Sequence, residues 1–134
     1  KIHEHINDQK VFIGYSIGQE VKKIDTAFWL DQEGFTFSPH IDNPGVDKVM
    51  QIYLSNCPKA GTVFYNINES AVTVKDDEQT WHYEGSNPPT DIRKAFDFKT
   101  NSGYLMINHK TQLHGVPYVV GKNDVRLSVY CWIN

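Results

Sequence analysis

The chain has little of several features that would assign a protein to a class at once. It has only two cysteines, Cys57 and Cys131, without a Cys-x-x-Cys spacing, so neither a disulfide framework nor a structural zinc site is expected. No apolar run approaches the roughly 20 residues needed to cross a bilayer. The first residues lack the apolar centre of a signal peptide. We therefore expect a cytoplasmic protein with no membrane partner.

Charge of one sign is also lacking. Thirteen Lys and Arg against sixteen Asp and Glu give a net charge of −3, and no basic run is present that could neutralise a phosphate backbone. A nucleic-acid polymer is thus disfavoured as a partner, although a nucleotide substrate is not. A length of 134 residues, with 40% hydrophobic and 13% aromatic residues, predicts one folded domain over residues 1–134.

Short stretches in which apolar and polar residues alternate dominate the chain, and clusters of turn residues separate them. This pattern predicts an all-β fold, a sandwich or jelly roll, with little helix. The only stretch that we expect to be helical is 18–29. The expected strands are residues 11–17, 35–39, 49–54, 62–65, 71–74, 95–99, 104–107, 113–116 and 125–133.

Three residues have the chemistry of a metal site. In an extended segment, residues two apart point to the same side, so His40 and Asp42 can share one ligand position. His114 follows in a second strand-like segment, whereas the rival ligand His109 lies in a polar loop and is expected at the surface. Two imidazoles and one carboxylate form a facial triad, which leaves open positions on Fe(II) for substrate and O₂.

A second candidate group lies in the final predicted strand. There Arg126 and Ser128 share a face with Tyr130 and Trp132. If this face is turned inward, the guanidinium is removed from water and needs an anion. A carboxylate can meet it in a bidentate pair, and the Ser128 hydroxyl can add a hydrogen bond. A small dicarboxylate that also reaches the metal would satisfy both ends.

Together, these segments resemble the 2-oxoglutarate- and Fe(II)-dependent oxygenases, and most closely their prolyl-4-hydroxylase-like branch. The resemblance extends from about Phe28 to the C-terminus. It depends on five short segments taken together: His40-Ile41-Asp42-Asn43-Pro44, Ile52-Tyr53-Leu54, Ala60-Gly61-Thr62-Val63, Leu113-His114-Gly115-Val116 and Arg126-Leu127-Ser128.

The resemblance implies a double-stranded β-helix, the cupin-like jelly roll, and an oxidoreductase that is a hydroxylase. It implies Fe(II) as cofactor, 2-oxoglutarate and O₂ as cosubstrates, ascorbate as a supporting reductant, and release of succinate and CO₂. The substrate would be a prolyl residue, an amino acid or another small molecule. By the same resemblance, the metal ligands and catalytic residues are His40, Asp42 and His114, and the residues that bind the cosubstrate are Arg126, Ser128, Tyr53 and Val63.

Two other classes use a similar barrel. One is a cupin-like domain that binds a metal or a small molecule, as an isomerase or a sugar-binding protein. It has no need of an arginine followed by a serine on an inward face. The other is a catalytically silent sensing or structural domain, since an intact motif does not establish turnover. Decarboxylation of 2-oxoglutarate without added substrate distinguishes the enzyme from both.

Overall fold

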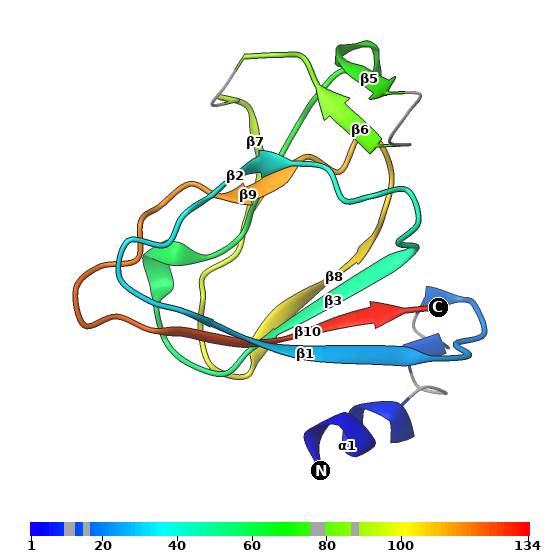
Figure 1. Ribbon diagram of the computed structural model, residues 1–134, viewed down its shortest axis with the longest axis vertical. Helices are drawn as coiled ribbons and strands as arrows, with labels where there is room; N and C mark the ends of the chain where they lie inside the picture. Colours follow the sequence, from blue (N-terminus) through cyan, green and yellow to red (C-terminus); the bar gives the residue numbers. More distant parts are fainter. Residues whose placement is uncertain (10–12, 15–16, 76–79, 87–88) are drawn as a thin grey trace.

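Two four-stranded antiparallel sheets form the body of the computed structural model, which describes residues 1–9, 13–14, 17–75, 80–86 and 89–134 (Figure 1). In spatial order, the first sheet consists of β1 (Ile24–Asp31), β10 (Arg126–Ile133), β3 (Lys48–Tyr53) and β8 (Ser102–Ile107). The second consists of β2 (Phe37–His40), β9 (His114–Val116), β4 (Val63–Tyr65) and β7 (Ile92–Ala95). The predicted mostly-β class is thus confirmed.

The remaining elements are short. β5 (Val72–Lys75) and β6 (Thr80–Tyr83) form a separate two-stranded sheet, which projects beyond the second sheet in Figure 1. The named helical elements are α1 (Ile2–Asp8) and the 3₁₀ turns η1 (Pro58–Ala60) and η2 (Glu69–Ala71), and the described residues 13, 14 and 17 are also helical. None of the helices in the described part of the chain is long and apolar enough to span a membrane.

The main core lies between the two sheets. Val49 and Tyr53 of β3 and Tyr104 of β8 pack there with Phe64 of β4 and Val116 of β9. On each strand, alternate residues turn away from this layer. The inward positions can therefore carry a site that both sheets share.

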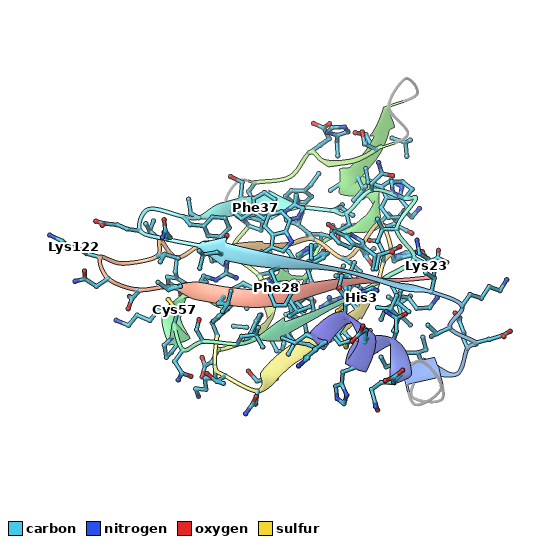
Figure 2. All side chains as sticks on the ribbon, turned by 60° about the horizontal axis from the view of Figure 1, so that its bottom comes forward. His3, Lys23, Phe28, Phe37, Cys57 and Lys122 are labelled. Atoms are coloured by element: carbon cyan, nitrogen blue, oxygen red, sulfur yellow. The ribbon has the colours of Figure 1, made fainter. Side chains whose placement is uncertain are left out.

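The outer faces of the two sheets are covered separately. On the first sheet, Ile24, Val129 and Cys131 pack with Ile6 of α1, which lies in front of that sheet in Figure 2. The N-terminal helix is held by this contact and by a hydrogen bond from Asn7 to the carbonyl of Ile24. On the second sheet, the hairpin β5–β6 contributes apolar side chains to a third cluster.

The predicted helix over 18–29 is wrong, because residues from Ile24 onward form β1. This strand pairs with β10 along its whole length, from Ile24 opposite Ile133 to Asp31 opposite Arg126. Its β-branched and aromatic residues suit a pleated, half-buried surface, and pairing with a central strand outweighs the weak helical pattern.

Smaller differences concern strand positions. Residues 10–12 and 15–16 of the predicted strand 11–17 lie outside the described residues, while Ile13, Gly14 and Ile17 are helical, so that prediction is wrong where it can be checked. The strand expected over 95–99 is shifted to β7, and only Phe98 pairs further on, in a bridge to Cys57. The sequence pattern missed β6.

Candidate metal centre and its pocket

A cavity of about 340 Å³ opens between the two sheets. This volume is at the small end of the range of ligand sites. Six aromatic residues contribute to its wall, and the polar members include the three predicted metal ligands and Arg126. The lining residues are Trp29, Asp31, Phe35, Phe37, His40, Asp42, Gln51, Thr62, Tyr104, His114, Gly115, Val116, Arg126, Tyr130 and Trp132.

The structure brings His40, Asp42 and His114 together, and one potential ligand atom from each lies within 4.8 Å of the others. Within the described residues, no other group of three or more His, Cys, Asp or Glu side chains meets this criterion. His40 ends β2 and His114 begins β9, and the two residues are register partners in the second sheet. Strand pairing therefore sets the two imidazoles side by side, with ring centroids 4.5 Å apart.

Hydrogen bonds to the backbone fix the orientation of both imidazoles. Nδ1 of His40 lies 2.9 Å from the carbonyl oxygen of Ser38, and Nδ1 of His114 lies 2.8 Å from that of Gln112. A carbonyl oxygen only accepts, so Nδ1 must donate in both cases. In the neutral ring, Nε2 then carries the lone pair.

Both Nε2 atoms face the same carboxylate oxygen. Oδ1 of Asp42 lies 3.5 Å from Nε2 of His40 and 3.9 Å from Nε2 of His114. Three acceptor atoms that converge in this way need a proton or a metal cation between them. Histidines that donate Nδ1–H to a carbonyl and offer Nε2 to the ion are the usual arrangement at metal sites. The donor set thus fits a divalent transition metal.

The protonation states of these groups suit a metal. Burial alone would raise the pKa of the Asp42 carboxyl, but its contacts with His40, His114 and Tyr130 lower the pKa overall. Burial, together with the nearby His40, lowers the pKa of His114. At neutral pH the carboxylate is therefore ionised and the His114 imidazole is neutral, as metal ligands must be.

Aromatic rings pack against the ligands. The Phe37 ring centroid lies 4.2 Å from that of His40, and the Phe64 ring stacks on His114 at 5.2 Å. Further along the wall, Tyr130 contacts Trp29 and Trp132, with centroid separations of 6.3 Å and 5.0 Å. Trp29 and Phe37 are about half exposed, and they give the cavity an apolar rim.

Another part of the cavity wall is built around Arg126, which is only 2% exposed. Its guanidinium carbon lies 4.5 Å from the Phe98 ring centroid and 5.2 Å from that of Phe35. Nη1 donates to Oδ2 of Asp31, directly opposite on β1, whereas Nε is buried with no partner. The sequence pattern did not indicate Asp31, because it lies just after the predicted helix 18–29, where no strand was expected.

Ser128 and Tyr53 belong to a buried polar network behind the cavity wall. Gln51 donates to the Ser128 hydroxyl at 2.9 Å, and the Tyr53 hydroxyl donates to that of Thr62 at 3.1 Å. Gln51 and Thr62 line the cavity, whereas Ser128 and Tyr53 do not. The two predicted contacts thus lie one side chain behind the residues that a ligand would meet.

Val63 does not line the cavity, contrary to the expectation. It packs on the outer face of the second sheet with Ile41 and Leu113. Its neighbours Thr62 and Phe64 point to the inner side instead. Side chains point alternately to the two faces of a sheet along a strand. Val63 and its two neighbours therefore face opposite sides, and the contact predicted for Val63 falls to a neighbour.

His109 stays apart from the metal ligands, as its polar surroundings predicted. It is exposed, and its Nδ1 lies 3.0 Å from the Thr111 hydroxyl. Neither cysteine forms a disulfide, and both are buried.

The chain matches no protein-family model, and no curated protein has a significantly similar sequence.

Proposed function

We propose that this chain is an Fe(II)- and 2-oxoglutarate-dependent oxygenase that hydroxylates a small molecule or an amino-acid residue of a peptide. One observation carries the proposal: His40, Asp42 and His114 and the buried guanidinium of Arg126 line one cavity. A ligand that chelates a metal through a 2-oxo acid group and has a distal carboxylate matches both features.

The sheet topology supports the finer fold expected for such an enzyme, a double-stranded β-helix. Strands β1 to β4 lie alternately in the first and the second sheet, and strands β7 to β10 lie alternately in the second and the first. Each strand of the first set pairs with a strand of the second, as in β1 with β10 and β2 with β9. A jelly roll requires two halves of a chain wound together in this way, and this agreement supports the proposed fold.

The chain's own residues would hold and orient the reactants. His40, Asp42 and His114 would hold Fe(II), and Arg126 would receive the distal carboxylate of 2-oxoglutarate. The bound iron would supply O₂ activation, with one oxygen atom passing to the substrate and the other to succinate as CO₂ leaves. The aromatic rim around Trp29 and Phe37 would exclude water and pack against the substrate near the metal.

The test is turnover by the full chain. Protein loaded anaerobically with Fe(II) is mixed with 2-oxoglutarate, ascorbate and O₂, and succinate and CO₂ are measured. Slow succinate release without substrate is expected, and it should disappear in Asp42→Ala but persist in His109→Ala. A mass-spectrometric screen of peptides and amino acids for the gain of one oxygen atom then identifies the substrate. If the protein binds iron and 2-oxoglutarate but forms no succinate with or without candidate substrates, the proposed enzymatic function is refuted.

A cupin-like domain that binds a metal and a small molecule is the second candidate, and one observation favours it. Asp31 already gives Arg126 a carboxylate, so the guanidinium does not need an anionic ligand for charge balance. Such a domain would bind the metal through the same triad, and its cavity would accept both neutral ligands and 2-oxoglutarate. Succinate formation separates the two candidates, because only the oxygenase produces it.

A further inference from the structure

Asp31 and Arg126 form an ion pair in the wall of the proposed cosubstrate cavity. The two residues are register partners on β1 and β10, so both side chains point inward at the same level. Asp31 is 8% exposed and Arg126 is 2% exposed, and both line the cavity. An ion pair so far removed from water interacts strongly with any further charge that enters.

The guanidinium is only partly satisfied by this pair. Arginine has five N–H donors in one plane, and here Nη1 is committed to Asp31 while Nε is buried without a partner. Phe35 and Phe98 lie within cation–π distance of the guanidinium, so its remaining interactions must be made in its own plane. A second carboxylate can therefore reach Arg126, but it does so beside the negative charge of Asp31.

We infer that Asp31 sets the affinity and selectivity of the cavity for carboxylate ligands, because it competes with the ligand for Arg126. This inference rests on the proposed function, since the ligand in question is 2-oxoglutarate. Asp31 keeps the guanidinium in place in the empty cavity. It also weakens the binding of a distal carboxylate, by neutralising Arg126 and by repelling the incoming charge.

A purely structural ion pair would behave differently. Lys23–Asp25, at the start of the same strand, joins Nζ and Oδ2 at 2.9 Å on the surface, and neither residue lines the cavity. Removing the Asp25 charge changes only a solvent-screened contact. Removing the Asp31 charge changes the charge of the cavity wall, and that change is visible in ligand selectivity.

The test compares Asp31→Asn with wild type and with the matched control Asp25→Asn. Asparagine keeps an oxygen that accepts from Arg126 but removes the negative charge. Proteins are loaded with Ni(II) as a redox-inert ion, and 2-oxoglutarate and 2-oxobutyrate, which lacks the distal carboxylate, are titrated by calorimetry. We expect Asp31→Asn to bind 2-oxoglutarate about tenfold more tightly than wild type does, whereas its affinity for 2-oxobutyrate should not change. Asp25→Asn should bind both ligands as wild type does.

Unchanged or weaker 2-oxoglutarate binding by folded Asp31→Asn would overturn the inference, and so would an equal gain for both ligands. If that variant does not fold, Asp31→Ser removes the same charge and is judged by the same criteria. Wild type alone provides another test: 2-oxoglutarate should bind less than about a hundredfold more tightly than 2-oxobutyrate, and a larger advantage contradicts competition by Asp31. Failure of the proposed function is seen separately, as absence of succinate from wild-type protein.

Discussion

The hydroxyl of Tyr130 donates a hydrogen bond of 3.3 Å to Oδ2 of Asp42, while Oδ1 of the same carboxylate faces the two histidines. Tyr130 is on β10 in the first sheet, whereas Asp42 follows β2 in the second. Burial and the nearby Asp42 charge raise the pKa of Tyr130, so the hydroxyl remains a donor at neutral pH. This contact between the sheets fixes which carboxylate oxygen is presented to a metal.

Replacing Tyr130 with phenylalanine should therefore weaken metal binding without removing a ligand. The ring and its contacts with Trp29 and Trp132 are kept, but Oδ2 of Asp42 loses its donor. Partners of this kind typically contribute about tenfold to a hundredfold in metal affinity, and we expect about tenfold here. The measurement is a Co(II) or Ni(II) titration. Tyr118→Phe, at an exposed position, is the control and should match wild type.

Loss of the Asp42 carboxylate should have a larger effect. In Asp42→Ala, two imidazoles remain without the charge that balances a divalent ion, so stabilisation by the metal should vanish. A ligand present at a hundred times its Kd stabilises the folded state by about 2.7 kcal/mol, which is easily seen in a thermal melt with and without Ni(II). His109→Ala is the control and should keep the full shift. If Ni(II) raises the melting temperature of Asp42→Ala as much as that of wild type, Asp42 is not a metal ligand.

Arg126→Lys tests the cavity wall that would receive the distal carboxylate. Lysine keeps the positive charge but loses the planar donors and the contacts with the Phe35 and Phe98 rings. We expect 2-oxoglutarate to bind more weakly by about 1.5 kcal/mol, the lower end for a charge-assisted hydrogen bond, because Asp31 shares the guanidinium. The readout is the metal-to-ligand charge-transfer band of the Fe(II) protein under anaerobic conditions. Arg93→Lys, at an exposed arginine, is the control. Equal affinities of wild type and Arg126→Lys for 2-oxoglutarate would show that its distal carboxylate does not bind Arg126.

The sequence indicated the proposed metal ligands because their chemistry is local. His40 and Asp42 are two residues apart in extended chain, and His114 stands in a short apolar segment of its own. Asp31 and Tyr130 were not assigned roles, because their partners become neighbours only after the sheets form. Asp31 meets Arg126 through the pairing of β1 with β10, which a predicted helix concealed. Strand periodicity is visible in a sequence, whereas the pairing of distant strands is not.

Both cysteines should be unreactive in the folded protein. Cys57 and Cys131 are 5% and 0% exposed, and neither forms a disulfide. Burial raises the pKa of both thiols, that of Cys131 to about 11, so little thiolate is present at pH 8. A thiol assay with Ellman's reagent should detect neither in buffer and two per chain in guanidinium chloride. Fast labelling of either thiol in buffer would contradict the burial described.

Gly115 allows β2 and β9 to lie close together next to the proposed metal site. A Cβ at this position would lie 2.8 Å from the Phe37 carbonyl oxygen and 3.0 Å from the Pro39 nitrogen. These are backbone atoms of β2 and cannot rotate away, so β2 must shift relative to β9. Because His40 ends β2 and His114 begins β9, the shift separates the two metal ligands.

We expect Gly115→Ala to lower the free energy of unfolding by about 1–3 kcal/mol, the usual cost of overpacking. We also expect Ni(II) affinity to fall, because the two imidazoles no longer meet the ion at their native separation. Gly45→Ala is the matched control, since a Cβ there would lie 3.4 Å from a side-chain oxygen of Asn43 and should be tolerated. Urea unfolding gives the stability, and a Ni(II) titration of the folded protein gives the affinity. A Gly115→Ala protein with native metal affinity would show that the spacing of β2 and β9 does not set the ligand geometry.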